Sequence, residues 1–327
     1  MPALREQRVF IYEFLSGGGL VGGEDGDDED LLEQGTAMRD ALVADLAGVP
    51  GVQISAATSG PEGFTKAPNL RWVRPRPEES PHDFVLRQAG AHDASWIVAP
   101  ETGGLLGCLR KLVGPLGWIG CDSAAIRVAG SKLATLEHLA RLGLPTPLAL
   151  SGTGEATRWI VKPDDGAGGL HARVHAGVAE ARADLAQRRR MNASATLEPW
   201  VEGEALSLSL LCGPQATELL SINRQHVTLA ADGALCFGGV ATGAIALDDG
   251  RAPALQRLAR DVVLALPGLR GCVGIDLVWH PARGPVLIEV NPRYTTAFVG
   301  LSQQLGRRIA LEALQQFSSR AELRHAA

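Results

Sequence analysis

Strand-like and helix-like segments alternate over residues 1–125, and this order constrains the fold more than any other feature of the chain. A strand-like run over residues 8–15 leads into a glycine-rich loop, SGGG, and a helical stretch follows over residues 31–46. The segments VQISAAT, PHDFVLRQAG, ASWIVAP and LLGCLRKLV then continue the pattern as strand, helix, strand and helix. Parallel strands need long crossover connections, which helices usually supply. We therefore predict an N-terminal α/β domain built on a parallel sheet.

The order of segments changes after residue 125. A helix over SKLATLEHLARL ends before Gly143 and Pro145, as helices commonly do, and the strand-like RWIVKP and the loop DDGAGGL come next. From Val201 onward the chain contains the strand-like runs ALSLSLLCG and TELLSINRQHV, a helix over ALQRLARDVVLAL and a hairpin of CVGIDLVW and GPVLIEV. We predict two α+β units here, over residues 126–200 and 201–327.

Charge and composition exclude several classes of partner. The formal charge is −5, and the only basic run, Arg188 to Arg190, is typical of a solvated helix end, so we expect no nucleic-acid partner. No window approaches the ~18 apolar residues of a membrane span, so we expect a cytoplasmic protein without membrane contact. Five scattered cysteines indicate buried thiols rather than disulfides or a zinc site. The acidic run Glu24 to Asp30 lacks EF-hand spacing and is predicted to be a solvated loop.

The hairpin near the C-terminus carries three side chains with oxygen atoms on one face. Asp276 lies on GIDLVW, while Glu289 and Asn291 lie two residues apart on the partner strand, LIEVN. Such oxygens suit Mg²⁺ or Mn²⁺, which complete their coordination with waters and substrate phosphates. A hairpin with its polar side in water would give the same pattern, but isolated acids among apolar neighbours are costly without a partner. The pattern therefore favours a metal site.

A lysine followed by a glycine-rich loop is the second candidate. Lys162 closes the strand RWIVKP, and DDGAGGL follows it. A lysine supplies a point charge and a glycine loop supplies free backbone N–H groups, both of which bind polyphosphates. The loop is neither a Walker A motif nor a GxGxxG fingerprint, and a plain turn is the alternative. Only four basic residues out of 31 are lysines, namely Lys66, Lys111, Lys132 and Lys162, so each is of interest.

The segment TLEPWVEGE is a third candidate. Its strand carries Glu198, and the main chain at Trp200 and Val201 could form hydrogen bonds with the edge of an adenine. An ordinary strand would look the same, so this segment gains meaning only from its neighbours.

The order of these motifs resembles the ATP-grasp superfamily from about Val9 to Gly300. The matching pieces are a serine–lysine pair that opens a helix, the strand–lysine–glycine loop, E-P-W-V-x-G, G-x-D and E-x-N-P-R. The resemblance implies a Rossmann-like pre-ATP-grasp domain followed by two α+β subdomains that clasp ATP between them.

The resemblance also implies roles for individual residues. Lys132 and Lys162 would bind the phosphates, and Arg293 would clamp the transferred phosphoryl group. A lid over the phosphates would consist of Asp165, Gly166, Ala167, Gly168 and Gly169. The adenine site would consist of Glu198, Trp200 and Val201. The metal site would consist of Asp276, Glu289 and Asn291. Many members hold the ribose with an acid two residues after the glycine of E-P-W-V-x-G, but here that position is Ala205 and the acid is Glu204, one residue earlier.

The reaction that the resemblance implies is the ATP-dependent joining of a carboxylate to an amine. The carboxylate would become an acylphosphate, and the amine would displace phosphate to form an amide. The segments IYEFLSGGG, APETGGLL, AIRVAGSKLAT and NPRYTTAFVGL resemble the tyramine-glutamate ligases, which act in assembling methanofuran-type one-carbon carriers. The substrates would be glutamate, through its γ-carboxylate, and tyramine or tyrosine. Similar ligases are commonly homodimers.

Substrate contacts are expected where the strands of a parallel sheet end. A glutamate substrate needs arginine or backbone N–H groups, and an ammonium group needs an acid such as Glu13 or Glu101. Glu101 equally suits a helix start, and the two threonines after NPRY equally suit a helix cap. The candidate substrate residues are Glu13, Gly18, Glu101, Thr102, Arg224, Thr295 and Thr296.

Three other functions stay open from the sequence. Another amino-acid or peptide ligase of the same superfamily would have the same ATP site. A small-molecule kinase would stop at phosphoryl transfer and need no amine. A nucleotide-binding protein without turnover would retain these motifs but lack a usable acceptor pocket.

Overall fold

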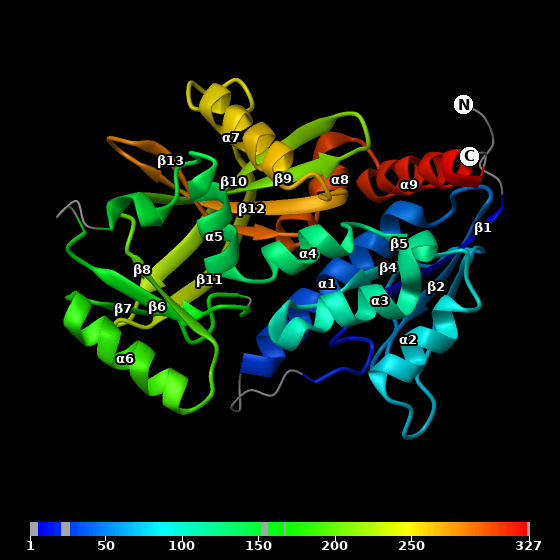
Figure 1. The fold of residues 1–327 in the computed structure, drawn as a ribbon. Coiled ribbons are helices and arrows are strands. Elements are labelled where there is room, and N and C mark those ends of the chain that lie inside the picture. The colour runs from blue at the N-terminus through cyan, green and yellow to red at the C-terminus, as the bar shows by residue number, and fades with distance from the viewer. Residues whose placement is uncertain (1–5, 21–26, 152–155, 167, 326–327) are drawn as a thin grey trace.

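Three β-sheets frame the structure, one in each of the three predicted segments (Figure 1). The structure is a computed structural model and describes residues 6–20, 27–151, 156–166 and 168–325. Sheet A has the strand order β3-β2-β1-β4-β5, and all its neighbouring strands are parallel. The alternating sequence therefore predicted this sheet correctly. Its strands are β1 (Gln7–Glu13), β2 (Val52–Ala57), β3 (Leu70–Val73), β4 (Ala94–Val98) and β5 (Trp118–Ile119).

Helices α1 (Asp27–Leu46), α2 (Pro81–Ala89) and α3 (Leu105–Gly117) connect the strands of sheet A. Ser80 caps α2 by accepting a hydrogen bond from the backbone N–H of Asp83 at 3.1 Å. The prediction of a loop over the whole acidic run was wrong, because α1 begins at Asp27. Acidic residues suit the first turn of a helix, where the helix dipole is positive. Glu24 to Gly26 lie outside the described residues.

Sheet B is small and antiparallel, with the order β7-β6-β8. Its strands are β6 (Trp159–Pro163), β7 (Arg173–His175) and β8 (Ala195–Pro199), and α6 (Val178–Arg190) packs on it. Helices α4 (Ser123–Ala129) and α5 (Lys132–Arg141) and the 3-10 helix η2 (Pro147–Leu150) precede this sheet. Ser131 caps α5 by accepting a hydrogen bond from the N–H of Ala134 at 3.1 Å, which puts Lys132 in the first turn.

Sheet C is antiparallel, with the order β11-β10-β9-β12-β13. Its strands are β9 (Glu204–Cys212), β10 (Thr217–Leu229), β11 (Leu235–Ile245), β12 (Gly271–His280) and β13 (Gly284–Asn291), and α7 (Ala252–Ala265) packs on it. The predicted hairpin is the pair β12 and β13. The sequence did not predict β11, because the glycines in LCFGGVATGAI resemble a loop more than a strand.

Two helices pack beyond the segment that contains them. Helix α5 contacts β13 of sheet C, and α9 (Ile309–His325) contacts α1 and β5. Figure 1 shows α9 lying along the N-terminal domain, after the short helices η3 (Thr296–Phe298) and α8 (Leu301–Leu305). One apolar cluster accordingly joins Val9 of β1 to Phe298 and to Leu314 of α9. Residues from all three segments, 1–125, 126–200 and 201–327, therefore border the space between the sheets.

The structure bears on the predictions of buried thiols and of a chain without a membrane span. Cys121, Cys212 and Cys272 are buried, as predicted, whereas Cys108 and Cys236 are exposed. In the part of the chain that the structure describes, no helix combines the length and apolar character needed to cross a membrane.

Candidate active site

A cavity of about 390 Å³ lies between β1 and α1 of the N-terminal domain, sheet B and sheet C. Most of the residues predicted from the sequence line it. They are Glu13, Thr102, Lys132, Lys162, Asp165, Gly166, Gly168, Gly169, Glu198, Trp200, Val201, Asp276, Glu289, Asn291, Arg293, Thr295 and Thr296. Ala167, also predicted, lies outside the described residues.

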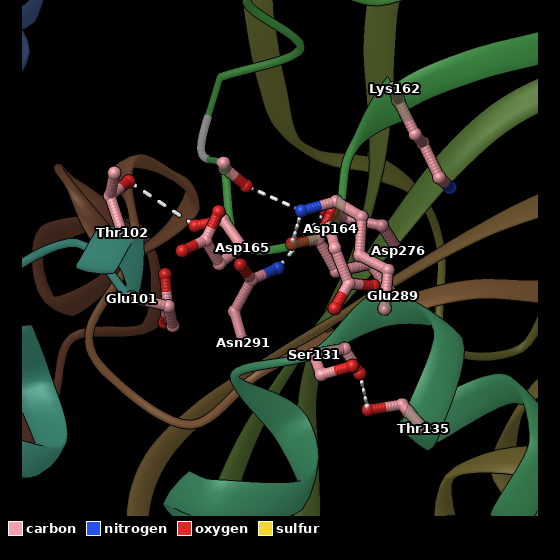
Figure 2. Close-up of polar contacts among 12 residues, drawn as sticks. Glu101, Thr102, Ser131, Thr135, Lys162, Asp164, Asp165, Asp276, Glu289 and Asn291 are labelled. Atoms are coloured by element: carbon pink, nitrogen blue, oxygen red, sulfur yellow. Dashed lines mark hydrogen bonds and ion pairs between the residues drawn. The ribbon is translucent and has the colours of Figure 1, made fainter. Parts of the chain in front are cut away.

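Two carboxylates and two amides form a cluster at the hairpin. Asp276 and Glu289 face each other across β12 and β13, and Figure 2 shows Asn291 beside them. Asn291 Nδ2 donates to Asp276 Oδ2 at 3.0 Å, and Gln225 Nε2 donates to Asp276 Oδ1 at 2.9 Å. Burial raises the pKa of Asp276, and the negative charge of Glu289 raises it further. The cluster therefore brings two carboxyl groups together in a buried place, where a bound cation would favour the charged form of both.

The donor atoms of this cluster fit an oxygen-preferring divalent cation. They are hard carboxylate and amide oxygens, without sulfur or imidazole, which suits Mg²⁺ or Mn²⁺ better than zinc. Within the described ranges, no group of three or more His, Cys, Asp and Glu side chains could hold a metal ion by itself. A bound cation would therefore depend on the Asn291 amide and on oxygens of a ligand or of water.

Lys132 connects the metal-type cluster to the glycine loop. Its Nζ lies 2.9 Å from Glu289 Oε1 and donates a hydrogen bond to the carbonyl of Gly166. Burial is the largest single influence and lowers the pKa of Lys132, but the charge and hydrogen bond of Glu289, together with the charges of Glu101 and Glu198, outweigh it and raise the pKa. Asp164 accepts hydrogen bonds from the backbone N–H groups of Lys132 and Leu133 at 2.9 and 2.8 Å. The first turn of α5 is thereby docked on the start of the loop.

Lys162 and Glu198 form a buried ion pair between neighbouring strands of sheet B. Lys162 Nζ lies 2.9 Å from Glu198 Oε2, and the two side chains are 8% and 1% exposed. Burial raises the pKa of Glu198, although the charge of Lys162 opposes the shift. The second oxygen, Oε1, is buried and has no hydrogen-bond partner among the residues that the structure describes. Because buried acceptors are nearly always satisfied, this oxygen in the cavity wall fits a donor such as the amino group of adenine.

The main chain next to Glu198 is partly occupied. The backbone N–H of Trp200 donates to the carbonyl of Arg158 at 2.9 Å, so it is not available to a ligand. Of the main-chain groups that the sequence suggested for binding adenine, the carbonyl of Trp200 and the main chain of Val201 therefore remain available.

The glycine loop lies between the N-terminal domain and sheet C. Gly168 and Gly169 have φ angles of +67° and +71°, which glycine adopts without strain. A Cβ at Gly169 would lie 2.7 Å from a methyl group of Leu235 on β11. Figure 2 shows Thr102 close to Asp165, whose carboxylate accepts a hydrogen bond from the N–H of Gly103 at 2.8 Å. The loop thus has contacts with both walls of the cavity.

Arg293 is held by a residue from the N-terminal domain. Its Nε and Nη2 atoms donate to Oε1 and Oε2 of Glu101 at 2.9 and 3.1 Å, and the side chains are 11% and 6% exposed. Glu101 does not line the cavity, and its negative charge is paired with the guanidinium. Thr295 and Thr296 follow at the cavity wall, and Thr295 does not cap the 3-10 helix η3 through its side chain.

Three other predicted residues lie outside the cavity wall. Gly18 is exposed beside Ser59, and Glu204 pairs with Arg224 at 2.6 Å on the surface. Gln225 lines the cavity instead of Arg224, because successive residues of a strand point to opposite faces. Gln225 lies two residues after the buried Asn223 and therefore on the same face of β10, but only the structure shows that Asn223 is buried.

The chain matches two family profiles and several known proteins. A profile described as an ATP-grasp domain matches residues 129–297, and one described as a pre ATP-grasp 3 domain matches residues 61–126. The tyramine–L-glutamate ligase of Methanocaldococcus jannaschii is 24% identical over 299 residues, which cover 90% of this chain and 85% of the relative. The enzyme of the same name from Methanocaldococcus fervens is 25% identical, with 90% of each chain covered.

A solved structure supports the same fold. It is that of an ATP-grasp superfamily protein from Archaeoglobus fulgidus, which superimposes with a TM-score of 0.68 at 21% identity. The alignment covers 94% of this chain and 88% of that one.

Proposed function

Because this chain belongs to the ATP-grasp family, we propose that it is an ATP-dependent ligase that joins the γ-carboxylate of L-glutamate to tyramine or tyrosine. The relatives named tyramine–L-glutamate ligase support the choice of substrates. The product would serve the synthesis of a methanofuran-like one-carbon carrier. The observation that carries the proposal is one continuous cavity, whose wall includes the free oxygen of Glu198, the Asp276–Glu289 pair and Arg293.

The nucleotide is bound by sheet B and the glycine loop in this proposal. Glu198 Oε1 accepts a hydrogen bond from the adenine amino group, and Lys132 and Lys162 bind phosphate oxygens. Asp276, Glu289 and Asn291 would hold Mg²⁺ or Mn²⁺, which supplies positive charge to the phosphates. The backbone N–H groups of Asp165, Gly166, Gly168 and Gly169 would cover the phosphates and limit the access of water.

Chemistry then proceeds in two steps. The glutamate γ-carboxylate attacks the γ-phosphorus of ATP, the bond to the ADP oxygen breaks, and an acylphosphate forms. Arg293, held in place by Glu101, stabilises the charge that develops on the transferred group. The amine loses a proton and attacks the acyl carbon, and phosphate leaves.

A coupled assay of ADP release tests the function. Purified protein with ATP and Mg²⁺ or Mn²⁺ should release ADP only when glutamate and tyramine or tyrosine are both present, and mass spectrometry should find the amide. A phosphorylated product formed without an amine would instead identify a kinase. ATP binding without ADP release across a panel of acids and amines would identify a non-catalytic binder, and turnover with other pairs only would identify a different ligase.

A variant pair links the assay to the site. Lys162→Met should abolish amide formation, because it removes the phosphate-binding charge and leaves Glu198 buried without its cation. Lys111→Met removes the same charge from an exposed position on α3 and should keep full activity. Equal activity of the two variants would contradict the placement of ATP in this cavity.

A further inference from the structure

Glu13 is a buried carboxylate at the end of the cavity that faces the N-terminal domain. It closes β1, is 3% exposed and lines the cavity. Its two oxygens accept hydrogen bonds from the backbone N–H groups of Leu15 and Ser16 at 3.2 and 2.8 Å. These bonds fix the carboxylate in place and leave lone pairs available on both oxygens.

No positive side chain in the described ranges forms an ion pair with Glu13. The charge of Arg39 acts on Glu13, but the Arg39 guanidinium donates to Asp40 at 2.8 Å and to Thr58 at 3.2 Å. Burial raises the pKa of Glu13, against the effect of the backbone hydrogen bonds. A buried carboxylate without a cation is costly, and a cationic group of a ligand would lower that cost.

Helix α1 is built to lie directly against this carboxylate. A Cβ at Gly35 would lie 2.5 Å from the carboxyl carbon and Oε2 of Glu13, so only glycine permits the observed approach. Glycine is unfavourable inside a helix, and Gly35 lies in the interior of α1. The close packing accounts for its presence there, and it makes the position of the Glu13 carboxylate a specific feature of this fold.

The surroundings of Glu13 are mainly apolar. Leu31 and Met38, on the same face of α1 as Gly35, line this end of the cavity together with Leu15. Phe237 and Val240 of β11 line the cavity as well, and Gln34 adds one neutral amide. Of the two acids that suited an ammonium group from sequence, Glu101 is paired with Arg293, whereas Glu13 has no such partner in the described part of the chain.

We propose that the junction of β1 and α1 is the subsite for the amine substrate, with its ammonium group on Glu13 and its apolar body against Leu31 and Met38. The inference rests on the proposed ligase function, because it assigns one end of the same cavity to the second substrate. It names the substrate class as a primary amine with a hydrophobic body. In the reaction, the ammonium donates one proton to the Glu13 carboxylate, and the freed nitrogen lone pair attacks the acyl carbon. The bond from that carbon to the phosphate oxygen breaks, and the second proton of the nitrogen passes to the departing phosphate.

The test separates activation of the acid from capture of the amine. Hydroxylamine is uncharged at neutral pH and traps an acylphosphate as a hydroxamate without needing an ammonium subsite. Glu13→Gln should raise the KM for tyramine about 10- to 100-fold, the effect of losing one charge-assisted hydrogen bond, while glutamate-dependent hydroxamate formation changes less than twofold. Glu33→Gln removes the same charge from an exposed position of α1 and is the matched control.

A second variant tests the role of the helix. Gly35→Ala should displace the Glu13 carboxylate and raise the KM for tyramine with little change in the trapping rate. Gly107→Ala is its control, because a Cβ inside α3 would meet only Ile126 at 3.8 Å. Comparing phenethylamine with short alkylamines reports on the apolar wall, and the larger amine should have the lower KM.

The outcomes distinguish the two proposals. An equal loss of amide and hydroxamate in Glu13→Gln would assign Glu13 to the acid substrate and overturn the subsite, as would unchanged tyramine kinetics. If the wild-type protein makes no hydroxamate from ATP and glutamate, the ligase proposal fails. Calorimetric titration of the wild-type protein and of Glu13→Gln with tyramine then tests the subsite. Loss of tyramine binding in Glu13→Gln supports the subsite, and retained tyramine binding in this variant overturns it.

Discussion

The buried pair of Glu101 and Arg293 allows a prediction with a definite magnitude. Glu101 follows β4 of the N-terminal domain, and Arg293 follows β13 of sheet C, 192 residues later. The two side chains meet through two hydrogen bonds at 2.9 and 3.1 Å and are 6% and 11% exposed, so solvent screens them little. We expect Glu101→Ala to destabilise the protein and to disable Arg293.

The size of the effect follows from the geometry. At an effective dielectric of about 20, two charges 2.9 Å apart attract each other by about 6 kcal/mol, part of which desolvation cancels. Removing one partner of a buried pair leaves the other charge uncompensated, which costs about 3–5 kcal/mol. At roughly 2–4 °C per kcal/mol for a large domain, the thermal midpoint should fall by at least about 6 °C. Loss of the orientation of Arg293 should lower kcat by about 100-fold.

Thermal unfolding followed by circular dichroism and the ADP-release assay measure these effects. Glu218→Ala is the matched control, because Glu218 binds Arg307 through a similar pair of hydrogen bonds but is 50% exposed. An exposed pair contributes about 0–1 kcal/mol, so the midpoint of this control should move by no more than a few degrees. If both variants shift the midpoint equally, or if Glu101→Ala keeps wild-type kcat, the reasoning about Arg293 is refuted.

Three further predictions follow from the same structure. Gly169→Ala should raise the KM for ATP about 5- to 30-fold in the ADP-release assay. The reason is that the φ angle of +71° at this position strains any residue other than glycine by about 1–2 kcal/mol. An unchanged KM would exclude the loop from ATP binding. Native labelling with iodoacetamide should modify Cys108 and Cys236 quickly and the three buried cysteines only after unfolding, as counted by mass spectrometry. The hydrogen-bonded Arg87 lowers the pKa of Glu79 to about 2. Glu79→Gln should therefore destabilise the protein at pH 7, and the loss of stability should shrink as the pH falls from about 4.5 to 2. Urea unfolding measures the difference, and a difference that does not change with pH would contradict this assignment.

Much of the fold could be predicted from local patterns. The alternation of strands and helices predicted the parallel sheet, and the apolar runs on either side of HPARG predicted the hairpin of β12 and β13. The alternation of side chains along β13 also placed Glu289 and Asn291 on one face. These predictions succeeded because the period of apolar residues and the chemistry of turns are properties of short segments.

Predictions that needed the partner of a side chain were less successful. Arg224 was chosen for its charge, but the direction of β10 turns Gln225 to the cavity and pairs Arg224 with Glu204. Glu101 was a candidate for binding substrate, but it is engaged by Arg293. Strand β11 was missed because its glycines conceal a strand that only the hydrogen bonds to β10 define.

The sequence by itself determined which chemical groups are present and in which order. These groups are Lys132 at the start of a capped helix, the glycine loop, Glu198 of sheet B, and the acids Asp276 and Glu289 of the hairpin. Only the tertiary structure decided which charges compensate one another and which remain for a ligand. Glu101 and Glu13 are both buried acids, yet among the described residues Glu101 forms an ion pair with a guanidinium and Glu13 does not. The physical reason is that burial and pairing depend on contacts between distant segments, such as Gly35 against Glu13, which no local pattern encodes.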